Sequence, residues 1–89
     1  MPPPMSEHPT NFQGSIHDAV RAAILAAIPD AQVDVEGQGG HFTIDVVSPV
    51  FAGKNRLESQ RLVLGSIKHL MAGDLAPVHA VDRLGTRTP

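Results

Sequence analysis

The spacing of apolar residues changes along this chain, and that change limits the possible folds more than any other feature. Apolar residues recur every three or four positions in residues 16–28 and again in residues 55–71, which is typical of helices with one buried face. They alternate with polar residues in 33–36 and 42–47, which indicates half-buried strands. A last stretch, residues 78–84, predicts a third strand. The expected order is therefore helix, strand, strand, helix, strand.

Residues with strong turn or capping preferences mark the ends of these elements. Ser15 precedes the first helical stretch and predicts its N-cap, while Pro29 ends that helix. Residues 37–40 read Gly-Gln-Gly-Gly, a connection short enough for an antiparallel hairpin. Gly73 is expected to stop the second helix, and residues 85–89 form a polar end.

The distribution of proline separates a tail from the folded part. Four of the eight prolines fall within the first nine residues, and proline removes backbone donors and blocks helices. Residues 1–13 are therefore predicted to be a disordered, proline-rich tail. The remaining length allows a single modest core, so we expect one domain over residues 14–85, followed by a flexible C-terminal end at residues 86–89.

The chain contains no cysteine. A disulfide framework, a thiolate zinc site, a cysteine nucleophile and a self-sufficient all-cysteine iron–sulfur site are thereby excluded.

The longest apolar run, residues 22–28, is far shorter than the roughly 20 residues that span a bilayer, and the first residues lack the features of a signal peptide. We therefore expect a soluble, cytoplasmic chain that is not secreted and has no membrane partner.

The element order predicts which strands are neighbours. A strand, a crossover helix and another strand in one sheet favour parallel pairing of the second and third strands, which gives an α+β fold with a three-stranded mixed sheet. Parallel neighbours that start together place their first residues at the same end of the sheet. His41 opens the second strand and His79 opens the third, so this topology brings two imidazoles near each other across 38 positions of sequence.

Two interpretations of this histidine pair stay open at this point. A histidine at a strand end is most often a surface residue or a local hydrogen-bond partner, and a closed zinc site needs four ligands. A partner that brings thiolates would make His41 and His79 half of a mixed site, because iron–sulfur clusters accept nitrogen ligands beside sulfur. The helical residues His17 and His69 are expected to be solvent-exposed.

No Ser-His-Asp order, Walker loop or HExxH motif is present, so we expect no enzymatic activity.

Charge is divided unevenly between the two halves of the chain. Residues 1–50 hold one basic and six acidic side chains, whereas residues 51–89 hold six basic and three acidic ones. A basic group lies at the start of the second helix and along it, and comprises Lys54, Arg56, Arg61 and Lys68. A helix start adds partial positive charge, so phosphate or an acidic protein surface is a candidate ligand here. The alternative is that these charges only solvate the outer face of the helix.

Three sequence elements read GHF at residues 40–42, VSPVFAGKNRL at residues 47–57 and VHAV at residues 78–81. In sequence and in order, they resemble elements of the BolA family. The resemblance covers residues 15–84. It implies a KH-like α-β-β-α-β sandwich of the type without a GxxG loop, with the helices on one face of the sheet.

The resemblance also implies a partner and a cofactor. BolA-like chains are partners of monothiol glutaredoxins in handling [2Fe-2S] clusters, where the glutaredoxin cysteine and glutathione supply the sulfur. The BolA-like chain supplies the histidine of its last strand, here His79, and a second ligand from the loop between the first two strands. Many relatives carry that ligand at positions matching residues 38–40, and His41 is the candidate in this chain. No cluster is expected in the isolated chain, which we expect to be a monomer or a weak homodimer.

The resemblance leaves a second function open, because some members of the family are described as DNA-binding transcription regulators. In this chain such binding would use Lys54, Arg56, Arg61 and Lys68. Many members have Arg-His-Arg at the centre of the helix, where this chain has Ser-Gln-Arg at residues 59–61, and its net charge is −2. A domain that binds other proteins without cluster or DNA is the third interpretation.

Overall fold

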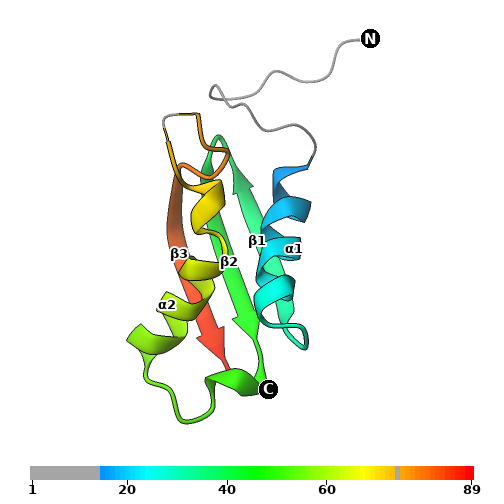
Figure 1. Ribbon diagram of the computed structural model, residues 1–89, viewed down its shortest axis with the longest axis vertical. Coiled ribbons are helices and arrows are strands. Elements are labelled where there is room, and N and C mark those ends of the chain that lie inside the picture. Colours follow the sequence, from blue (N-terminus) through cyan, green and yellow to red (C-terminus); the bar gives the residue numbers. More distant parts are fainter. Residues whose placement is uncertain (1–14, 74) are drawn as a thin grey trace.

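The computed structural model describes residues 15–73 and 75–89, in which two helices cover a three-stranded sheet (Figure 1). Single 3-10 turns, η1 (Pro49–Phe51) and η2 (Lys68–Leu70), precede and follow the second helix. The tail predicted at residues 1–13 lies outside the described residues. The main elements are, in chain order, α1 (Ile16–Ala27), β1 (Gln32–Gln38), β2 (His41–Val47), α2 (Arg56–Ser66) and β3 (Ala80–Arg87).

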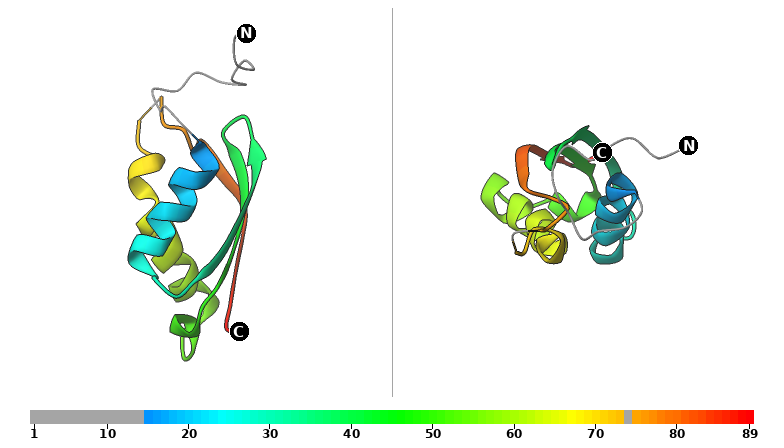
Figure 2. Two further views of the ribbon diagram at one scale, coloured as in Figure 1. Left: turned by 90° about the vertical axis from the view of Figure 1, so that its right-hand side faces the viewer. Right: turned by 90° about the horizontal axis from the view of Figure 1, so that it is seen from above.

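The sheet has the predicted mixed topology. Its strand order is β1-β2-β3, with β1 antiparallel to β2 and β3 parallel to β2. Both helices lie on one face of the sheet, as the two further views show (Figure 2). The α+β architecture expected from the change in apolar spacing is therefore confirmed. Within residues 15–73 and 75–89, no helix has both the length and the apolar character needed to cross a membrane.

The N-termini of both helices are fixed by side-chain caps. The hydroxyl of Ser15 accepts a hydrogen bond from the Asp18 N–H at 3.2 Å, as predicted. At α2, the Asn55 side chain accepts from the Glu58 N–H, and the Glu58 carboxylate accepts from the Asn55 N–H. This reciprocal capping box satisfies two donors that the helix cannot pair internally.

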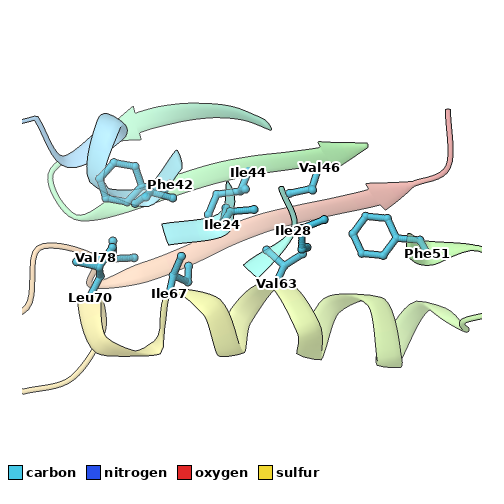
Figure 3. Packing of buried hydrophobic residues seen from close by; sticks show 11 residues of the cluster. Ile24, Ile28, Phe42, Ile44, Val46, Phe51, Val63, Ile67, Leu70 and Val78 are labelled. Atoms are coloured by element: carbon cyan, nitrogen blue, oxygen red, sulfur yellow. The ribbon is translucent and has the colours of Figure 1, made fainter. Parts of the chain in front are cut away.

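The core lies between the helices and the covered face of the sheet (Figure 3). On β2, Phe42, Ile44 and Val46 are buried, as their alternation with polar residues predicts. Ile24 of α1 and Val63 of α2 are also fully buried and close the core from the helix side. On the strand face opposite the helices, His41, Thr43 and Asp45 alternate with these core residues.

The β1–β2 hairpin is tighter than predicted, because Gly37 and Gln38 belong to β1 and only Gly39 and Gly40 form the turn. Both turn residues have positive φ, 65° and 82°, which suits a two-residue turn that matches the twist of the strands. Gly37 has φ 117°, and a Cβ atom there would lie 2.2 Å from the carbonyl oxygen of His41. Any other residue at this position would therefore strain the hairpin.

Two predicted boundaries are wrong. The single helix expected to run to Gly73 ends at Ser66, and η2 follows, because a 3-10 turn also places residues three apart on one face. The third strand begins at Ala80 and ends at Arg87, not at residues 78–84. β3 therefore continues past residue 85, at which the folded domain was predicted to end. Pairing with β2 continues β3 through a polar stretch that has no strand pattern of its own.

Candidate functional site

The starts of β2 and β3 are held together by one backbone carbonyl. The oxygen of Gly40 accepts hydrogen bonds from the N–H groups of His79 and Ala80, both at 2.8 Å. In the parallel ladder, His41 pairs with Ala80, so His79 lies directly before the partner of His41. The hairpin turn and the entry to β3 meet at one end of the molecule (Figure 1).

This arrangement brings the two predicted ligand residues together. The ring centroids of His41 and His79 are 5.7 Å apart, and the ring planes are inclined by 51°. Both residues are exposed, with 54% of the His41 side chain accessible. Among residues 15–73 and 75–89 no group of three or more His, Cys, Asp or Glu side chains is placed to hold a metal ion. The described part of the chain therefore places two exposed imidazoles side by side at this end of the sheet.

A third residue orients one of these rings. β3 has an irregularity opposite Phe42 and Thr43: these residues pair with Val81 and Arg83, so Asp82 is the extra residue of a bulge. Bulges redirect side chains, and here Asp82 Oδ1 lies 3.2 Å from His41 Nδ1. An ionised carboxylate only accepts, so in this contact Nδ1 is the donor, and in the neutral tautomer with that proton the lone pair is on Nε2.

His17 is not the exposed helical side chain that was expected. It is half-buried, its Nε2 lies 2.8 Å from the carbonyl oxygen of Gly37, and its ring packs edge-on against Phe42 at 5.5 Å. His17 therefore ties α1 to the hairpin beneath the histidine pair. The predicted exposure of His69, in η2, is confirmed.

The predicted basic residues divide into two sets. Lys54 and Arg56 line a groove beside β3, together with Arg83 and Arg87 from that strand. Arg61 and Lys68 are exposed but do not line this groove.

Three functional candidates were missed from the sequence: Asp82, Arg83 and Arg87. The charge count of residues 51–89 included all three, but nothing local linked Asp82 to His41, which is 41 positions away. Only an expected bulge in the last strand would have pointed to that contact.

Comparison with known proteins assigns the family. Residues 15–89 match the BolA-like protein family. The chain belongs to that family. Its helices and mixed sheet superimpose on a bolA protein homologue from Coxiella burnetii with a TM-score of 0.69 and 32% identity, covering 86% of this BolA-like chain and 94% of the homologue.

Two further relatives agree with this assignment. BolA1 from Mus musculus, solved in solution, matches with a TM-score of 0.65 and 26% identity over 100% of this chain and 84% of its own. Acid stress protein IbaG from Escherichia coli strain K12 is 27% identical over 66 residues, which cover 74% of this BolA-like chain and 76% of IbaG.

Proposed function

We propose that this BolA-like protein is a non-enzymatic adaptor that binds a monothiol glutaredoxin and shares the ligation of a [2Fe-2S] cluster during iron–sulfur trafficking or iron regulation. The glutaredoxin cysteine and glutathione supply the sulfur ligands, and His79 and His41 supply nitrogen. The proposed setting is the cytoplasm, where the glutathione pool is kept reduced. The cluster is cargo that passes through the complex.

The observation that carries this proposal is the exposed histidine pair at one end of the sheet. A nitrogen ligand lies about 2.1 Å from its metal, so two nitrogens on one metal are at most about 4 Å apart. Rings with centroids 5.7 Å apart can bring their nitrogens within that range. In one known kind of [2Fe-2S] cluster, two imidazoles bind one iron and two thiolates bind the other. This ligation raises the reduction potential of the cluster.

The surroundings of the pair suit ligation by His41. Histidine ligands generally donate their second ring N–H to a carboxylate or a carbonyl, which fixes the tautomer and the ring orientation. The contact between His41 Nδ1 and Asp82 is of this kind. His41 therefore presents Nε2 to the partner with little further reorganisation. This contact supports His41 as the second ligand, although His41 is the first residue of β2 and does not lie in the preceding turn.

The proposal is tested by adding the purified chain to glutaredoxin loaded with cluster and glutathione. Binding is expected to change the visible absorption and circular dichroism, because the ligands of iron change. His79→Ala and His41→Ala should each alter or abolish this change. His69→Ala is the matched control, since His69 is an exposed histidine outside the pair. A spectral change that survives both substitutions in the pair would contradict ligation by these residues.

Binding of DNA stays a prediction. It relied on four basic residues acting together, and only Lys54 and Arg56 share a groove. A gel-shift titration at low salt would detect it, because phosphate contacts make affinity fall with salt at a slope of about −0.9 per contact.

A further inference from the structure

A groove of about 650 Å³ follows the outer edge of β3 at the end away from the histidine pair. We call it the edge groove. One wall is the first part of α2, with Arg56, Ser59 and Gln60, and the other is the last part of β3. Lys54 closes the groove beside the start of α2. Figure 1 shows α2 lying along β3 on this side of the sheet.

The groove exposes the backbone of an edge strand. β3 is the last strand in the order β1-β2-β3, so one of its sides has no strand neighbour in the described sheet. Arg87 directs its carbonyl toward the β2 side, where it accepts from the Ser48 N–H at 3.0 Å. Leu84 directs its carbonyl the other way, and it accepts from the Gln60 side chain at 3.3 Å. Since successive residues alternate, Thr86 presents its N–H and C=O to the groove.

The charge of the groove is strongly biased. Four cations line it, Lys54, Arg56, Arg83 and Arg87, against one carboxylate, Asp45. None of the four has an ion-pair partner within residues 15–73 and 75–89.

The cations lie on both sides of the strand edge. Leu84 packs against the core, so it faces the helices. Because side chains alternate along a strand, Arg83 and Arg87 lie on the opposite, open face. Lys54 and Arg56 come from the α2 side. A chain lying beside β3 would therefore meet positive charge on both of its faces.

We propose that the edge groove binds an extended acidic peptide segment of a partner protein, which adds to β3 as a fourth strand. Addition of a strand between an edge strand and a helix is an established mode of peptide recognition, in which backbone hydrogen bonds give affinity and side-chain contacts give specificity. The exposed edge of β3 supplies the backbone groups, and the four cations select acidic side chains. The proposal is independent of cluster ligation, because the groove contains neither His41 nor His79.

Nucleic acid fits the groove less well than a peptide does. Sequence-tolerant binding of single strands relies on aromatic side chains that stack with bases. The described phenylalanines, Phe42 and Phe51, are both buried, and the chain has no Trp or Tyr. The N–H and C=O groups that Thr86 presents at the strand edge pair with another peptide backbone, not with a sugar-phosphate chain.

The first test measures binding of a short fluorescent peptide of alternating Glu and Val to the full chain by anisotropy. The same peptide with Gln in place of Glu should bind more weakly. Arg83→Gln and Arg87→Gln should each weaken binding of the acidic peptide by about 5-fold, the upper range for an exposed ion pair. Lys68→Gln, outside the groove, is the matched control. Equal binding of both peptides, or no effect of the arginine substitutions, would overturn the proposal.

The second test addresses strand addition without changing the protein. Methylating the backbone nitrogens at every second residue of the peptide removes the donors on one side only. One methylation pattern should abolish binding and the alternate pattern should preserve it. Equal effects of both patterns, or displacement of the peptide by a tighter-binding oligonucleotide, would overturn the proposal. His79→Ala should leave peptide binding unchanged, and Arg83→Gln should leave the cluster spectrum unchanged, so failure of one proposal does not imply failure of the other.

Discussion

The two ends of β3 are built in different ways. At its start, backbone hydrogen bonds from His79 and Ala80 to Gly40 and the contact between Asp82 and His41 fix the positions of individual atoms. At its end, arginines gather around the edge groove with no ion-pair partners in the described part of the chain. The start of β3 presents imidazole nitrogens in defined positions, whereas its end presents a cluster of positive charges. Under the two proposals, one strand serves two kinds of recognition, of which only binding in the edge groove should be strongly sensitive to salt.

Removing the imidazole of His79 is expected to have the largest effect of the changes considered, and the effect should be confined to the histidine end of β3. His79→Ala should lower the affinity of the complex with glutaredoxin for cluster by more than about 100-fold, because loss of a ligand exceeds loss of a supporting contact. Cluster transfer to a chelator measures this affinity. His79→Cys restores a ligand and should recover affinity with a lower reduction potential. An unchanged affinity for cluster in His79→Ala would show that the histidine end does not ligate the cluster and acts only as a docking surface, like the edge groove.

Asp82→Ala tests whether the histidine end depends on orientation. We expect the affinity for cluster to fall by about 10–100-fold, as is typical when a carboxylate that supports a histidine ligand is lost. The measurement is the same chelator competition. Asp34→Ala removes another exposed carboxylate from the sheet and should have no effect. Equal values for the two variants would mean that Asp82 does not position His41.

Gly37→Ala tests the hairpin that carries His41. An alanine Cβ would clash with the His41 backbone, and φ 117° strains any residue with a side chain. The free energy of unfolding should fall by about 1–3 kcal/mol, measured by urea denaturation. Gly65→Ala, in α2 with open space around it, should instead stabilise the protein by about 0.5–1 kcal/mol. Similar shifts in both variants would refute the conformational argument.

Asn55→Ala tests the basic end, and its expected effect is the smallest. Loss of the cap at α2 should reduce the free energy of unfolding by about 1 kcal/mol. Asn55→Asp keeps an acceptor and should retain the stability. Both variants should leave the cluster spectrum of the complex unchanged. A cluster defect in either variant would mean that the two ends are coupled through α2.

Much of the fold could be predicted because its signals are local. The Ser15 cap, the alternation around Ile44 and the element order led to the mixed sheet, and the parallel pairing led to the nearness of His41 and His79. The end of β3 could not be predicted in the same way. Thr86 and Arg87 have no strand pattern, and pairing with β2 alone makes them a strand.

The candidate site was predictable to the same extent. His41 opens β2 and His79 directly precedes β3, and the topology makes these two strands neighbours. Asp82 joins them only because a bulge displaces it from the regular register, and a register irregularity between distant segments has no local signature. The edge groove could be predicted in part, because Lys54 and Arg56 lie at a helix start. Arg83 and Arg87 come from a strand about 30 positions later in the sequence, and no local pattern links them to the helix start.

The most direct test of the account is pulsed electron paramagnetic resonance of the reduced cluster in the complex. The BolA-like chain would carry ¹⁵N in its histidine rings, and the glutaredoxin and glutathione would be unlabelled. The account predicts ¹⁵N hyperfine couplings from two imidazoles, one lost in His79→Ala and the other in His41→Ala. A cluster that binds in the complex without any ¹⁵N coupling would contradict it.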